Sequence, residues 1–148
     1  MGTVSYEPPV ASAGKYLTFR VARRDFAMKA EHVRGILPVH EMVALNTPHK
    51  WISGFARIGG HDFPVVDLTA KLAIPNGSRG REPFIIVVAA GEKLVGFIAD
   101  RVSDLLDVRA RDFRNGALRG HGRPRQVLDP GQIMTDEEWS ALRVMPSP

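Results

Sequence analysis

The histidines and serines of this chain are the first residues to test for chemistry, because a metal site or a nucleophile needs them at defined spacings. The five histidines include no pair four residues apart and no HExxH motif, the patterns that place zinc ligands on one helix face. The serines lie in neither GxSxG nor SxxK, the contexts of an activated serine nucleophile. Cysteine is absent, which excludes thiolate zinc sites, a cysteine nucleophile and disulfides. We therefore expect no enzyme activity, no metal and no cofactor.

A group of aspartates, Asp100, Asp104 and Asp107, could bind a cation or act in acid-base chemistry. The surrounding sequence has neither the glycine nor the final glutamate of an EF-hand loop, so we interpret the group as the solvated end of a strand. The adjacent glycines Gly59 and Gly60 lack the order of a phosphate-binding loop and are typical of a turn.

The net charge of +4 is concentrated in one segment. From Arg109 to Arg125, six arginines against the single Asp112 give the segment a charge of +5, which leaves −1 for the rest of the chain. A small basic β-barrel that binds nucleic acid through this segment is therefore an alternative function. Phe113 is the only aromatic residue of the segment, too few for a base-stacking platform, so a solvated loop without a nucleic-acid partner is favoured.

The composition is that of one globular domain, with 44% hydrophobic and 24% charged residues among 148. The longest apolar run, residues 84–90, is far shorter than the roughly 20 residues that cross a bilayer, and we expect no direct insertion into a membrane. Residues 1–14 contain Pro8, Pro9 and little apolar mass, so we expect a flexible leader before a domain of residues 15–148. No signal peptide or lipidation motif is recognisable, which predicts a cytoplasmic location.

Alternating apolar residues predict three β-hairpins. The expected strand pairs are 16–21 with 26–28, 55–58 with 63–68, and 84–89 with 94–99. Short helical turns are expected within 30–34 and 69–72, and a last strand at 127–128. Thr135 and Glu138 form a capping box that predicts a short C-terminal helix. Many short strands with little long helical periodicity predict an all-β fold of small β-barrels.

Three stretches of the sequence resemble one protein family. They are YLTFRVARRDFAMKAEHVRGI (residues 16–36), GFARIGGHDFPVVDL (54–68) and FIIVVAAGEKLVGFIADRVSDLL (84–106). Together they are similar to the CheW-like adaptor domain of bacterial chemosensory arrays, from residue 15 to about residue 108. The resemblance implies two small SH3-like β-barrels packed together. It also implies a non-enzymatic adaptor that bridges the cytoplasmic tip of a chemoreceptor to a CheA-type histidine kinase.

The resemblance further implies which residues contact these partners. The groove between the barrels would receive the receptor tip through Val33, Ile36, Gly54, Phe84, Gly96 and Val102. In the family, the hairpin before PVVDL usually contains NLRG, and its arginine is associated with partner contact. Gly59 occupies that position here, and Arg57 lies two residues earlier on the same face of the strand.

The segment between Val108 and Leu128 is shorter than in full-length relatives. The sequence therefore resembles a shortened variant, of the kind found in accessory pathways such as the myxobacterial Frz-type systems, with a shortened second barrel. The short segment and the loss of the family arginine at Gly59 together predict weak or absent binding to the kinase. Binding to the receptor is expected to be retained.

Overall fold

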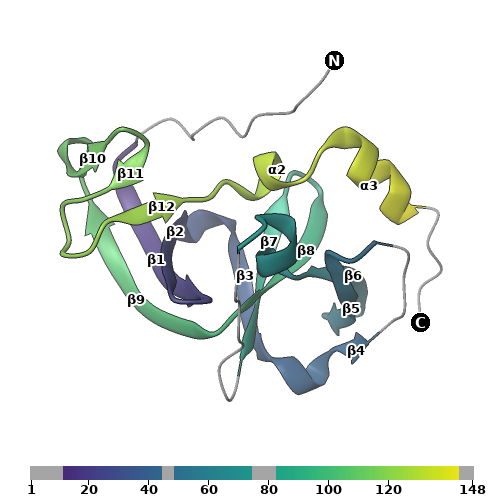
Figure 1. The fold of residues 1–148 in the computed structure, drawn as a ribbon. Coiled ribbons are helices and arrows are strands. Elements are labelled where there is room, and N and C mark those ends of the chain that lie inside the picture. Colours follow the sequence, from purple (N-terminus) through teal and green to yellow (C-terminus); the bar gives the residue numbers. More distant parts are fainter. Residues whose placement is uncertain (1–11, 45–48, 75–82, 144–148) are drawn as a thin grey trace.

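The computed structural model describes residues 12–44, 49–74 and 83–143, and within them it contains two six-stranded sheets. One sheet has the strand order β10-β11-β12-β2-β1-β9 and forms barrel A, and the other has the order β3-β7-β8-β6-β5-β4 and forms barrel B. Figure 1 shows the two barrels next to each other. The prediction of an all-β fold with two small barrels is thus confirmed. Most of the expected leader, residues 1–11, lies outside the described residues.

Barrel A combines strands from the N-terminal and C-terminal parts of the described chain. Its strands are β1 (Gly14–Val21), β2 (Arg24–Lys29), β9 (Arg101–Val108), β10 (Phe113–Arg114), β11 (Ala117–Leu118) and β12 (Arg125–Val127). β9 pairs antiparallel with β1, and β12 pairs parallel with β2. The segment after β9, which the resemblance assigned to a shortened second barrel, therefore completes the sheet of the N-terminal hairpin. The physical reason is apolar packing, because Leu118 and Val127 fill the same small core as Tyr16 and Ala27.

Barrel B is built from the central part of the chain. Its strands are β3 (Val33–Pro38), β4 (Val43–Ala44), β5 (Ile52–Ile58), β6 (His61–Val66), β7 (Phe84–Ala90) and β8 (Lys93–Ala99). Short helical turns η1 (Ala30–His32) and η2 (Val39–Glu41) flank β3, and α1 (Leu68–Lys71) follows β6. The predicted β5–β6 hairpin turns at Gly59 and Gly60, whose φ angles of 55° and 80° explain why glycine is needed at both positions.

A hydrophobic core shared by both barrels holds them together. It contains Phe19 and Phe26 of barrel A, Ile86 and Phe97 of barrel B, and Leu128 from the C-terminal segment, among other residues. Successive side chains of a strand point to opposite faces, so β7 places alternate residues in this shared core and in the interior of barrel B. The relative position of the barrels is therefore fixed by buried side chains.

Asp100 secures the first hairpin. Ala22 and Arg23 form its turn with positive φ angles of 49° and 69°, which are unfavourable for residues with side chains. The carboxylate of Asp100 accepts a hydrogen bond of 2.7 Å from the backbone N–H of Ala22 and so holds this turn. Asp104 exchanges backbone hydrogen bonds with the Thr18 hydroxyl. The expected solvated strand end is thus wrong for Asp100, whose carboxylate holds the turn. Asp104 is exposed and contributes only its backbone to these hydrogen bonds, so its carboxylate is free to be solvated as expected.

The C-terminal segment runs along both barrels, from β12 in barrel A through α2 (Pro130–Ile133) to α3 (Asp136–Arg143) beside barrel B (Figure 1). The predicted capping box is present. The Glu138 backbone N–H donates to the Thr135 hydroxyl over 3.1 Å, and the Thr135 N–H donates to the Glu138 carboxylate over 2.7 Å. Glu138 also forms an ion pair with Lys71 of α1, which attaches α3 to barrel B.

Candidate functional site

Apolar side chains of β3 and β7 reach the surface beside the shared core. In the antiparallel register Val33 lies opposite Val88, and Ile36 lies opposite Ile86. Val88 and Ile86 belong to the shared core, and residues opposite each other point to the same face. Phe84 follows the same alternation along β7 and therefore shares this face. The side chain of Ile36 is 43% exposed and that of Phe84 is 37% exposed, while Val33 is half-buried.

The strand β9 contributes a second apolar row from barrel A. Val102 lies opposite Phe19 of the shared core, and Leu105 lies opposite Leu17. Leu17 and Val102 are half-buried against the shared core, whereas Leu105 is 56% exposed. We call these residues of both barrels the apolar rim, and its members are Leu17, Val33, Ile36, Phe84, Val102 and Leu105.

The structure brings together four of the six residues expected at the receptor and adds two that the sequence did not identify. Val33, Ile36, Phe84 and Val102 all belong to the apolar rim. Leu105 was missed because exposure cannot be read from an apolar residue in a strand. The VSDLL motif could have indicated it, because Leu105 lies on the same strand as Val102, which was already expected at the receptor.

The two expected receptor-facing glycines are buried in barrel B. A Cβ atom on Gly54 would lie 2.1 Å from the carbonyl oxygen of Val43, because the backbone of β4 passes directly over it. A Cβ atom on Gly96 would lie 2.6 Å from a methyl group of Ile85 and 3.0 Å from the ring of Phe63. Close packing within barrel B is sufficient to explain glycine at both positions.

The expected kinase-facing arginine is already paired. The Arg57 guanidinium donates two hydrogen bonds to the Asp62 carboxylate across the β5–β6 hairpin, Nε to Oδ1 at 2.7 Å and Nη2 to Oδ2 at 3.2 Å. These hydrogen bonds lower the pKa of Asp62 and raise that of Arg57. Gly59 lies exposed in the turn with no other atom near its Cβ position, so it presents only backbone.

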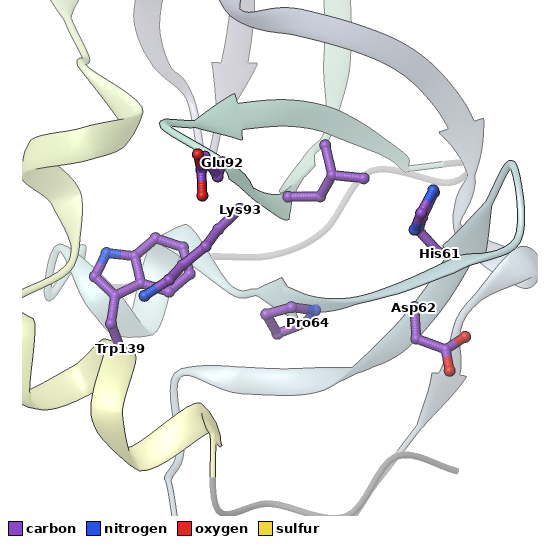
Figure 2. A pocket seen from close by; sticks show the side chains of 7 residues that line it. His61, Asp62, Pro64, Glu92, Lys93 and Trp139 are labelled. Atoms are coloured by element: carbon purple, nitrogen blue, oxygen red, sulfur yellow. The ribbon is translucent and has the colours of Figure 1, made fainter.

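Two hollows flank this hairpin. The smaller, of about 180 Å³, is lined by residues that include Val43, Phe55 and Arg57. The larger, of about 450 Å³, lies between β6, the β7–β8 turn and α3, as Figure 2 shows. In it the ammonium group of Lys93 lies 4.8 Å from the centre of the Trp139 ring, a cation–π contact that holds α3 against barrel B.

The one aromatic ring of the basic segment is held in a packing contact. Phe113 is half-buried and packs edge-on against Tyr16, with 5.6 Å between the ring centres. A ring held in this way is not available as a platform for stacked bases. No observation therefore supports the nucleic-acid alternative.

The described part of the chain also lacks two other kinds of feature. Among residues 12–44, 49–74 and 83–143, no three histidine, aspartate or glutamate side chains gather in a group that could hold a metal ion. Over the same residues, no helix is both long and apolar enough to span a membrane.

Comparison with known proteins identifies the family. A family model described as the CheW-like domain matches residues 15–138, so the similarity extends well beyond the limit near residue 108 that the resemblance indicated. The chain is 30% identical to a chemotaxis protein CheW of Rhizobium meliloti (strain 1021), in an alignment that covers 89% of this chain and 99% of that protein. It is 28% identical to the chemotaxis protein CheW of Klebsiella aerogenes, over 77% of this chain and 69% of that protein.

A solved structure shows the same fold. The crystal structure of the scaffolding protein TtCheW from Thermoanaerobacter tengcongensis matches with a TM-score of 0.73, covering 90% of this chain and 94% of that chain at 15% sequence identity. The two barrels and the segment that connects them are thus shared between sequences that have diverged widely. On the family model and the Rhizobium relative together, this chain belongs to the CheW-like domain family.

Proposed function

We propose that this chain is a non-enzymatic, cytoplasmic adaptor of chemotaxis signalling that binds the signalling tip of a chemoreceptor through its apolar rim. The observation that carries the proposal is the distribution of exposed apolar side chains. Four large hydrophobic side chains are exposed among the described residues, and three of them, Ile36, Phe84 and Leu105, belong to the rim. Exposed apolar side chains on strands that border the shared core favour association with an apolar partner surface.

The rim suits a helical partner because its residues come from two sheets with a fixed relative position. A helix tip with apolar side chains a turn apart can contact β3 and β7 on one side and β9 on the other. Gly54 and Gly96 affect such binding by keeping the backbone of barrel B closely packed, since neither has an exposed surface of its own.

We further propose that the kinase contact is weak or absent. Gly59 supplies no side chain at the position where relatives usually have arginine. The nearest cation, Arg57, is held by two hydrogen bonds to Asp62, and a kinase carboxylate would have to compete with that partner. Loss of one arginine contact commonly costs about 2 kcal/mol, which is roughly a 30-fold loss of affinity.

Isothermal titration with two purified partners tests both parts of the proposal. A soluble receptor signalling fragment is expected to bind, and Phe84→Asp is expected to weaken this binding strongly because a carboxylate would be buried against apolar surface. Circular dichroism must show that the variant is folded. Normal binding by folded Phe84→Asp would overturn the proposal that the receptor binds through the rim. For the kinase regulatory domain, micromolar binding that is lost in Arg57→Ala would show that the arginine contact has moved by two residues and is retained.

A further inference from the structure

A cluster of exposed arginines lies at the end of barrel A formed by η3 (Ala110–Asp112), β10 and β11. We call it the arginine platform, and its members are Arg109, Arg111, Arg114, Arg119 and Arg123. In Figure 1 this end of barrel A lies on the opposite side of the molecule from β4, β5 and α3. The platform is therefore separate from the β5–β6 hairpin, where the kinase contact was expected.

The single carboxylate of the segment is used inside the loop. Asp112 accepts a hydrogen bond of 2.8 Å from the backbone N–H of Arg109 and lies 3.2 Å from Nε2 of His121. The backbone N–H of Arg119 donates to the carbonyl oxygen of Asp112 over 2.7 Å. The hydrogen bond from the Arg109 backbone lowers the pKa of Asp112, with a further contribution from His121. Asp112 thus links η3 to residues 119–121, and its carboxylate has little capacity left for the guanidinium groups around it.

Gly120 allows this arrangement. A Cβ atom at this position would lie 2.2 Å from Oδ1 of Asp112, so only glycine lets the carboxylate approach the loop so closely. Asp112 therefore fixes the conformation of the backbone that carries the arginines. This backbone in turn fixes the Cα positions from which the guanidinium groups extend.

The arginines themselves are mostly unneutralised. Within the described part of the chain, the side chains of Arg114 and Arg119 form no hydrogen bond and no ion pair. Arg123 approaches Asp25 to 3.7 Å, but Asp25 is also bound by Arg20 at 3.2 Å. These exposed groups carry the same charge, so their mutual repulsion favours binding of an anionic partner.

We propose that the arginine platform is a docking surface for an acidic segment of a protein partner, distinct from the apolar rim. Guanidinium groups bind carboxylates through paired hydrogen bonds, and the charge of the platform complements a run of glutamates or aspartates. A nucleic acid is disfavoured because Phe113 packs against Tyr16. Membrane insertion is disfavoured because none of the exposed large hydrophobic side chains belongs to the platform. The proposal does not depend on the receptor contact.

The test uses the full chain and a fluorescent peptide of ten glutamates, with a peptide of ten glutamines as the uncharged probe. Fluorescence anisotropy at 50 mM NaCl is expected to show binding to the glutamate peptide alone. We expect this binding to weaken by about tenfold at 300 mM NaCl, because salt screens exposed charges. Arg114→Glu and Arg119→Glu are each expected to weaken binding by about fivefold, since an attraction becomes a repulsion.

Lys50→Glu is the matched control, because it makes the same change of charge at an exposed position outside the platform. It should change binding by less than about twofold, as expected for a screened charge outside the contact. An equal effect of Lys50→Glu, or no binding to the glutamate peptide at 50 mM NaCl, would overturn the proposal. Tighter binding to vesicles containing phosphatidylserine, or to duplex DNA, than to the glutamate peptide would also overturn it. The folded state of each variant is checked by circular dichroism, and Arg119→Gln replaces Arg119→Glu if the latter does not fold.

Discussion

Replacing Leu105 by serine tests the receptor contact with the least disturbance of the fold. The side chain is 56% exposed, so about half of its apolar surface is available for a partner to bury. Burying a complete leucine side chain contributes about 1.5 to 3 kcal/mol, which gives about 1.3 kcal/mol for the exposed part. Leu105→Ser should therefore raise the Kd for a receptor signalling fragment by about eightfold to tenfold. The other half of the Leu105 side chain is already buried in the folded protein, so Leu105→Ser should lower the free energy of unfolding by only about 1 kcal/mol.

The matched control is Val43→Ser. Val43 is 52% exposed, but it lies on β4, which pairs with β5 and not with β3, β7 or β9, so it is not a member of the apolar rim. The assay is titration of each variant with the same receptor fragment, together with urea unfolding to measure stability. Unchanged affinity of Leu105→Ser would remove Leu105 from the binding surface. An equal loss in Val43→Ser would show that binding depends on general surface hydrophobicity, and the reasoning from the apolar rim would fail.

Three further predictions concern the C-terminal segment and the interior of barrel B. Burial raises the pKa of Glu138, but hydrogen bonds from Lys71 and Thr135 outweigh it and hold the pKa below the usual 4.5. The stabilisation by the Glu138 carboxylate is therefore complete above pH 4.5 and is lost as the pH falls through the lower pKa of the folded state. Glu138→Gln should lower the free energy of unfolding, measured in urea, by about 1 kcal/mol at pH 7 and by much less near pH 3. Truncation after Met134 removes α3 and should lower the Tm or promote association in light scattering; an unchanged Tm and a monodisperse monomer would contradict this. Gly96→Ala should cost about 1 to 3 kcal/mol in chemical unfolding because its Cβ collides with the interior of barrel B, whereas Gly131→Ala in α2 should be neutral.

The local elements were predictable because short-range chemistry determines them. The β5–β6 turn needs two residues with positive φ, and the sequence places Gly59 and Gly60 there. Thr135 and Glu138 have the spacing of a capping box, and their reciprocal hydrogen bonds form as expected. In both cases the residues that specify the structure are within three positions of each other.

The pairing of distant strands was not predictable from such signals. Leu17 lies opposite Leu105, and Phe26 lies beside Gln126 in a parallel pair. Nothing in the hydrophobic alternation of β1 or β2 states which distant strand each will join, because the same alternation suits several partners. This is why the segment after Val108 was expected in the second barrel and lies instead in barrel A.

The candidate site was predicted in part for the same reason. The resemblance proposed Val33, Ile36, Phe84 and Val102 by position, and the structure places them in the apolar rim, but the resemblance could not separate such residues from glycines that pack inside. Gly96 contacts Ile85 and Phe63 within barrel B, and a tight packing contact leaves no mark in a single sequence. Exposure is a property of the assembled fold, so the distinction between Gly96 and Phe84 needs the structure.

The geometry of the apolar rim depends on residues that are remote from it in the sequence. The rim joins β3 and β7 of barrel B to β9 of barrel A, so its width is set by how the barrels meet. The residues that set this contact include Leu128, Ile133 and Met134 of the C-terminal segment, which are buried in the shared core with side chains of both barrels. Close-packed cores deform little, so the affinity of a partner for the rim also depends on this packing. A loss of packing at Ile133 is therefore expected to alter the width of the rim and so to weaken receptor binding, although Ile133 itself is buried and is not a rim residue.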